Sequence, residues 1–150
     1  MGRPKKKSDD PDEATEAAWC NERRKEVLAY LRSEGLRHGR VGVWPAWHVW
    51  PYVSLWAIES RVARDRIGWW AVSGDLPTDY VSADGVVHPR EALRAIASLW
   101  REAAGCMKRG EPHPQLPIGE RGDWRKLAPL LLSRAQLFES FANDDSLWEE

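Results

Sequence analysis

Three carboxylates in the middle of the sequence are the side chains best suited to catalysis. Asp75 and Asp79 lie in the segment Ile67–Tyr80, where a predicted strand runs into a turn-rich loop, and Glu59 ends the preceding apolar run. Loop carboxylates can bind a metal ion or act as general acid and base. The Gly-Asp and Pro-Thr-Asp sequences here also form turns in which the carboxylate accepts backbone N–H bonds, and this structural interpretation is favoured. A small hydrolase using these three carboxylates is therefore an alternative function, and the balance is against an enzyme.

Other residues that could do chemistry lack the required spacing. The four histidines are scattered without metal-ligand spacing, and the two cysteines lie far apart on apolar helix faces. The sequence contains neither a serine in a nucleophile elbow nor a glycine-rich phosphate loop. We therefore expect no catalytic residues, no metal site and no cofactor.

Tryptophan is the strongest anomaly, with ten in 150 residues. A buried tryptophan removes roughly 150–250 Å² from water, so a core of this size would struggle to cover them all. Trp69 and Trp70 are adjacent, and successive strand residues point to opposite faces. The sequence therefore predicts an aromatic, aspartate-flanked surface that binds another protein. The predicted partner-binding residues are Trp44, Trp47, Trp50, Trp69, Trp70, Asp75, Asp79 and Tyr80.

The repeat of Trp44, Trp47 and Trp50 at every third position has two interpretations. A polyproline-like segment has three residues per turn and would stack the rings along one edge, where they would grip a ligand. Alternatively, the segment is a lid packed over the sheet, which is favoured because aromatic side chains mostly serve packing.

The two ends of the chain carry weaker signals. Residues 2–7, Gly-Arg-Pro-Lys-Lys-Lys, resemble an AT-hook core, so DNA association through Arg3, Lys5, Lys6 and Lys7 is a second alternative. A short basic run is more often a solvated tail, and the net charge of −1 excludes nucleic-acid binding through the overall field. Near the C-terminus, Leu147 and Trp148 are candidate anchors of a docking tail, although frayed termini are commoner.

Hydrophobic periodicity predicts an α+β fold. Helical spacing marks residues 13–37, 88–110 and 123–142, and strand-like runs lie at 52–60 and 67–73. Short strands are also possible at 41–44 and 80–82, which gives an antiparallel sheet of two to four strands in the order α-β-β-(β)-α-α. We expect one domain over residues 13–142 between a disordered charged tail, 1–12, and an acidic tail, 143–150.

Three motifs resemble those of a known family. They are Trp56-Ala-Ile-Glu-Ser60, Gly68-Trp-Trp-Ala-Val-Ser-Gly-Asp-Leu-Pro-Thr-Asp-Tyr80 and His88-Pro-Arg-Glu-Ala-Leu-Arg94. Together they resemble a bacterial family catalogued as a domain of unknown function, over roughly residues 15–142. The resemblance implies a small bacterial cytoplasmic protein and brings no catalytic residues with it.

Location and function follow by elimination. The N-terminus lacks the apolar stretch of a secretory signal, and the uncharged run Val41–Ile58 is interrupted by prolines, so we expect a cytoplasmic protein outside the membrane. The leading hypothesis is a non-catalytic protein-binding module, either a toxin-neutralising immunity protein or a regulatory adaptor. Its partner would then be another protein, such as a toxin, and the sequence leaves the oligomeric state open.

Overall fold

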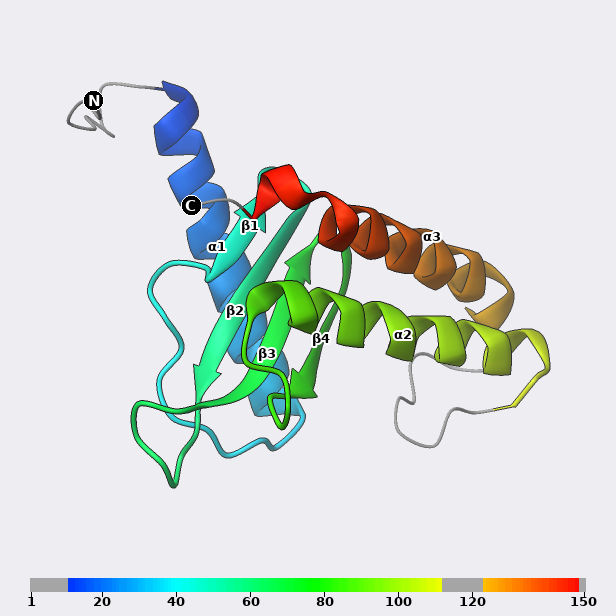
Figure 1. The fold of residues 1–150 in the computed structure, drawn as a ribbon, viewed down its shortest axis with the longest axis horizontal. Coiled ribbons are helices and arrows are strands. Elements are labelled where there is room, and N and C mark those ends of the chain that lie inside the picture. The colour runs from blue at the N-terminus through cyan, green and yellow to red at the C-terminus, as the bar shows by residue number, and fades with distance from the viewer. Residues whose placement is uncertain (1–10, 112–122, 149–150) are drawn as a thin grey trace. The chain divides into compact units, whose positions relative to one another are not determined.

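The computed structural model describes residues 11–111 and 123–148, which form two compact units that divide between Asp79 and Tyr80 (Figure 1). The division falls within the last strand of a four-stranded sheet. The elements preceding it are α1 (Pro11–Ser33), β1 (Trp47–Val49), β2 (Val53–Glu59) and β3 (Ile67–Gly74), followed by β4 (Leu76–Ser82). The second unit holds α2 (Pro89–Lys108), α3 (Trp124–Asn143) and a short 3-10 helix, η3 (Asp145–Leu147).

The sheet is antiparallel, with the strand order β1-β2-β3-β4. Trp47 pairs with Leu55 and Val49 with Val53 at one side of β2, and β3 pairs along the whole of the other side. The predicted α+β fold, with three helices and a small antiparallel sheet, is confirmed. One strand was missed, because residues 47–49 form β1.

Both faces of β2 are buried. Val53 and Leu55 point to one face, while Ser54, Trp56 and Ile58 point to the other, and all are fully buried. The second face is the one that α1 covers, because His48 and Ser73 lie beside Ser54 across the sheet and their side chains contact Glu16 and Glu26 of α1. In Figure 1, α1 accordingly runs behind the sheet.

Helix α1 buries Cys20, Val27 and Leu31, which recur at helical spacing within the predicted range 13–37. Burial, with a smaller contribution from Glu16, raises the pKa of the Cys20 thiol to about 11, so this cysteine stays protonated and serves packing. The Arg24 guanidinium of α1 donates to the carbonyl oxygens of Val41 and Gly42 at 3.0 and 2.8 Å. These bonds attach the chain that leads into β1 to the helix.

The second unit is built on two helices that pack along their apolar faces. In α2, Leu93, Ile96, Trp100, Ala103 and Met107 recur at helical spacing and form a buried stripe. Helix α3 begins at Trp124, close to the predicted start at residue 123, and Pro129 lies inside the helix. A proline in this position removes one backbone N–H donor, and the buried contacts of α3 with α2 outweigh that loss.

Candidate functional site

Four large apolar side chains are exposed around the edge strand β1. The exposed fractions are 80% for Val43, 43% for Trp44, 37% for Trp50 and 52% for Tyr52. All four lie within ten residues of chain and flank a strand of three residues. We call this set the aromatic surface. Val43 and Tyr52 were not among the predicted site residues, although Tyr52 belongs to a Trp-Pro-Tyr sequence typical of a turn.

The turn between β1 and β2 presents Trp50 and Tyr52. The Tyr52 amide donates to the Val49 carbonyl oxygen at 2.7 Å, and the Tyr52 carbonyl oxygen accepts from the Asp75 amide at 2.9 Å. Both backbone groups of Tyr52 are thus bonded, one within its own turn and one to the turn that follows β3. The peptide bond between Trp50 and Pro51 is cis. The two hydrogen bonds of Tyr52 hold this turn against the one that follows β3.

The exposed ring of Trp44 packs against His48 of β1. The rings of Trp44 and His48 meet edge to face, with centroids 5.4 Å apart and an interplanar angle of 88°. His48 in turn lies 2.5 Å from Glu16, measured from its Nε2 to the carboxylate Oε2, so it is bonded to α1. The exposed indole thus rests on an imidazole whose own position is set by the helix.

A chain of polar groups supports the same face of the sheet. The Trp56 indole N–H donates to Ser54 Oγ at 2.8 Å, and Ser54 Oγ donates to the Ser73 carbonyl oxygen at 2.8 Å. The Ser73 hydroxyl then bonds Glu26 of α1. Both serines are fully buried, and each has a partner, as buried hydroxyls require.

The polyproline interpretation of residues 44–50 is wrong. Residues 47–49 are a strand, so Trp47 and His48 point to opposite faces, and Trp47 is half-buried while Trp44 and Trp50 are exposed. Pairing with β2 supplies the hydrogen bonds that a polyproline segment would leave to water. The three rings therefore do not form one stack.

The remaining predicted partner-binding residues are dispersed. Trp69 and Tyr80 are half-buried, Asp75 is exposed in the turn between β3 and β4, and Trp70 is 1% exposed. Asp79 was expected on a loop, but it lies within β4 and is 2% exposed. A ring or carboxylate that is buried in this way cannot touch a partner, so Trp70 and Asp79 do not belong to the aromatic surface.

The three carboxylates of the hydrolase alternative are not brought together. Glu59 pairs with Ile67 at one end of the β2–β3 hairpin, and Asp75 follows Gly74, which pairs with Val53 at the other end. The six residue steps from Val53 to Glu59 correspond to about 20 Å along a strand. Asp79 is buried in β4. This placement provides no common pocket for a general acid and base.

Glu59 is ionised, whereas a general acid must carry a proton. Its carboxylate accepts from Arg40 Nη2 and from the backbone amides of Arg40 and Asp65, each at 3.2 Å. The side-chain bond from Arg40, followed by the amides of Asp65 and Arg40, lowers the pKa of Glu59 to about 2. The group is therefore a fixed anion.

The lowered pKa of Glu59 predicts a loss of stability in acid. Because the folded-state pKa lies below the ordinary value of 4.5, the stabilisation is present above pH 4.5 and is lost as the pH falls toward 2. In urea titrations across that range, the unfolding midpoint of Glu59→Gln should start lower and fall less steeply than that of the wild type. Glu139→Gln is a matched comparison in the second unit: because Arg101 lowers the pKa of Glu139 as well, its acid profile should change in the same direction. Parallel pH profiles for wild type and Glu59→Gln would contradict the assignment.

The candidate docking tail is folded against its own unit. The Trp148 indole N–H donates to the Phe141 carbonyl oxygen at 2.9 Å, and its ring lies 5.8 Å from the His88 ring. Trp148 is half-buried, whereas Leu147 in η3 is 36% exposed. A ring engaged in this way would have to be released before it could anchor on a partner.

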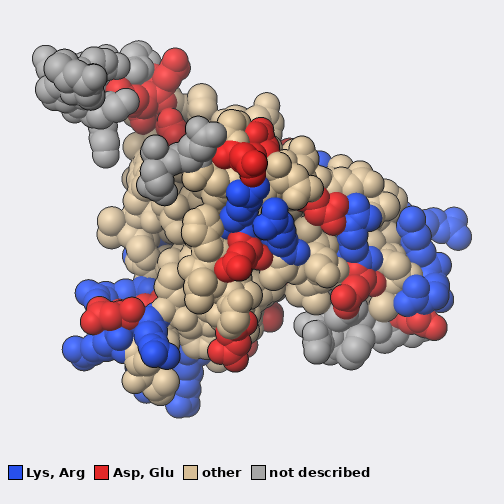
Figure 2. Space-filling model, viewed as in Figure 1, with Lys and Arg blue, Asp and Glu red and all other residues tan. Residues whose placement is uncertain are grey.

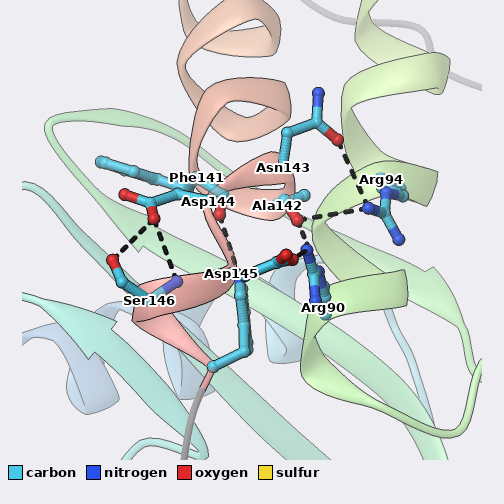
Figure 3. Close-up of polar contacts among 9 residues, drawn as sticks. Arg90, Arg94, Phe141, Ala142, Asn143, Asp144, Asp145 and Ser146 are labelled. Atoms are coloured by element: carbon cyan, nitrogen blue, oxygen red, sulfur yellow. Dashed lines mark hydrogen bonds and ion pairs between the residues drawn. The ribbon is translucent and has the colours of Figure 1, made fainter.

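Arginines from the third motif hold the end of α3 (Figure 3). The Arg90 Nε and Arg94 Nη2 atoms donate to the Ala142 carbonyl oxygen at 2.5 and 3.2 Å, and Arg90 Nη2 pairs with Asp145 at 2.5 Å. Cations at a helix C-terminus satisfy its last carbonyl groups and the negative end of its dipole. His88 caps the start of α2 by accepting from the Arg90 amide at 3.0 Å. This motif therefore has a structural task.

Two further expectations concern metal ions and the membrane. Within residues 11–111 and 123–148, histidine, cysteine and carboxylate side chains do not gather into any group of three or more that would hold a metal ion. None of the helices in the described parts of the chain has the length and apolar character needed to cross a membrane.

The basic residues of the DNA-binding alternative, Arg3, Lys5, Lys6 and Lys7, lie outside the described residues, as does most of the predicted tail 1–12.

Three helices and a four-stranded antiparallel sheet place the protein in the α+β class. Comparison of its sequence with models of known families identifies the family. The chain matches the family described as Domain of unknown function (DUF4826) over residues 13–148, and it belongs to that family. No curated protein and no solved structure matches the chain. The resemblance inferred from the three motifs, to an uncharacterised family, is confirmed.

Proposed function

We propose that the protein is a binding module that captures another protein through the aromatic surface formed by Val43, Trp44, Trp50 and Tyr52. The observation that carries this proposal is the exposure of these four side chains around one edge strand. Single exposed apolar residues are ordinary on a protein surface, whereas grouped ones indicate an interaction site. Tryptophan and tyrosine are also the residues most enriched at the centres of protein interfaces.

The support beneath the aromatic surface favours tight binding. His48 and Glu16 fix the Trp44 ring, and hydrogen bonds on both sides of Tyr52 fix the turn. A surface that is already ordered loses less conformational entropy when it binds. Asp75, exposed in the adjoining turn, adds a negative charge that would complement a basic group at the rim of the interface.

A toxin-neutralising immunity protein and a regulatory adaptor are the two forms of such a module that we propose for a cytoplasmic bacterial protein. In the first, the partner is a toxin whose activity falls on binding, and in the second it is a protein whose activity or assembly is changed. The two forms share the aromatic surface and differ in the partner, so identification of the captured protein distinguishes them.

Replacing Trp44 and Trp50 by alanine should abolish partner capture and leave the fold intact. Because both rings are partly exposed, the double variant should keep the urea unfolding midpoint near that of the wild type, while the loss of two aromatic anchors should weaken binding at least about a hundredfold. A photo-crosslinking amino acid at position 52 in the full chain identifies the partner, and the purified pair gives the affinity by titration calorimetry.

Val87→Ala is the control, since Val87 is 81% exposed and lies in the second unit. It should bind like the wild type, and a crosslinker at position 87 should not yield the same partner. Two results would overturn the proposal. One is equal affinity in the Trp44/Trp50 double variant, and the other is a crosslink that joins only copies of this chain, with a dimer that the double variant dissolves.

A further inference from the structure

The loop that joins β2 to β3 carries a second, chemically different feature. Its sequence from residue 60 to residue 66 is Ser-Arg-Val-Ala-Arg-Asp-Arg, with three basic side chains and one acidic. Figure 2 shows lysine and arginine side chains gathered at the lower left, over the place where Figure 1 draws this loop. The chain as a whole carries a net charge of −1, so this positive region is a local feature.

The loop encloses a pocket of about 440 Å³ within the first unit. Its lining comes from the loop itself, from the end of β2 and from the segment before β1. These residues are Gly39, Arg40, Glu59, Ser60, Arg61 and Arg64. A pocket of this volume falls in the range of sites that hold small molecules. None of these lining side chains is aromatic, so the pocket offers no ring on which a base or sugar would stack.

The one acidic side chain in the pocket is already neutralised. Arg40 and Glu59 form an ion pair at 3.2 Å, and the amide of Asp65 adds a further bond to the same carboxylate. Glu59 therefore fixes Arg40 and cancels its charge. The charge that remains in the lining belongs to Arg61 and Arg64.

Arg61 and Arg64 are the available donors. Both side chains are exposed, and among the residues that the structure describes neither guanidinium makes a hydrogen bond or an ion pair. The backbone that carries them is nevertheless ordered, because the Ser60 amide donates to the Arg66 carbonyl oxygen at 2.8 Å and Ser60 Oγ accepts from the Ala63 amide at 3.2 Å. The ordered loop thus presents two guanidinium groups, those of Arg61 and Arg64, to the pocket.

One wall of the pocket, at Gly39, lies directly against Glu59. The Gly39 amide donates to the Glu59 carbonyl oxygen at 2.8 Å, and a Cβ atom at Gly39 would lie 2.7 Å from Glu59 Oε1. The segment at Gly39 and the loop of residues 60–66 therefore both contact Glu59.

We infer that this pocket binds a small ligand through a group of two or more linked phosphates. Guanidinium groups present paired N–H donors that match phosphate oxygens, and two of them on one loop match a diphosphate better than a single anion. The absence of an aromatic lining means that recognition rests on the phosphates and not on the group they are attached to. This inference is independent of the aromatic surface, since it rests on other residues.

Titration calorimetry of the full chain with pyrophosphate tests the inference. Arg61→Gln combined with Arg64→Gln should weaken binding at least about tenfold, since each arginine supplies charge-assisted hydrogen bonds. Arg32→Gln combined with Arg125→Gln is the matched control, because it removes the same charge from exposed helix positions outside the pocket. This control should bind like the wild type, and both double variants should unfold at the same urea concentration as the wild type.

The choice of ligand separates the possible outcomes. Pyrophosphate should bind more tightly than inorganic phosphate, and ADP should bind with an affinity like that of pyrophosphate because the base and ribose make no specific contact. Absence of pyrophosphate binding to the wild type at millimolar concentration would overturn the inference. An equal loss in both double variants would also overturn it, since the attraction would then come from overall charge.

Discussion

Replacing Trp100 by alanine is expected to lower the free energy of unfolding by about 3–5 kcal/mol, the usual cost of removing a large buried aromatic side chain. Trp100 of α2 is fully buried and stacks on Phe138 of α3, with ring centroids 5.2 Å apart and an interplanar angle of 28°. Its removal leaves a cavity at the centre of the contact between the two helices, and the remaining side chains can fill that space only in part.

Urea unfolding followed by circular dichroism measures the effect. Trp100→Phe should lose less than Trp100→Ala, because a smaller ring still stacks on Phe138. Leu130→Ala on α3, where the side chain is 36% exposed, should cost less than about 1 kcal/mol. A cost for Trp100→Ala no greater than that of Leu130→Ala would show that the contact between α2 and α3 does not depend on this ring pair.

The helices and the two long strands could be predicted because their signals are local. In α2 the apolar residues Leu93, Ile96 and Trp100 recur at helical spacing, and the buried face follows directly. Strands β2 and β3 are long enough for their aromatic and β-branched content to be distinctive. In these segments the local pattern and the tertiary packing require the same residues.

The edge strands were missed or misplaced because they depend on partners elsewhere in the chain. β1 has three residues between two prolines, and only its hydrogen bonds to β2 define it as a strand. β4 contains Pro77, which indicated a loop and so placed Asp79 wrongly. Proline is tolerated in β4 because an edge strand does not need every N–H for pairing.

The candidate sites were predicted to different extents for a similar reason. Ten tryptophans indicated that some rings stay exposed, and Trp44 and Trp50 do, but no local pattern distinguishes them from the buried Trp70. The sequence shows the loop of residues 60–66 only as a charged segment between two strand-like runs. Its pocket also needs Gly39 and Arg40, about twenty residues earlier in the chain, and no local pattern joins these two segments.

Replacing Gly74 by alanine should destabilise the protein by about 2–5 kcal/mol through two separate effects. Its φ angle of +153° belongs to a region that L side chains rarely adopt. A Cβ atom there would also lie 2.3 Å from the Tyr52 carbonyl oxygen and 3.0 Å from Val53 Cα, and both of these are backbone atoms that cannot rotate away. The backbone segments at Gly74 and at Tyr52 would have to move apart, and the hydrogen bond from the Asp75 amide to the Tyr52 carbonyl oxygen would break.

Gly35→Ala isolates the effect of the backbone conformation, because Gly35 has a φ of +70° and a Cβ atom there would meet nothing within 4 Å. It should cost only the conformational strain, about 1–2 kcal/mol in urea unfolding. The two variants also separate function from stability. Since the Tyr52 carbonyl oxygen is the atom that must move, Gly74→Ala should weaken partner capture by the aromatic surface under conditions where it remains folded, whereas Gly35→Ala should capture the partner normally. Equal capture by the two variants would mean that the turn after β3 does not position Tyr52 for binding.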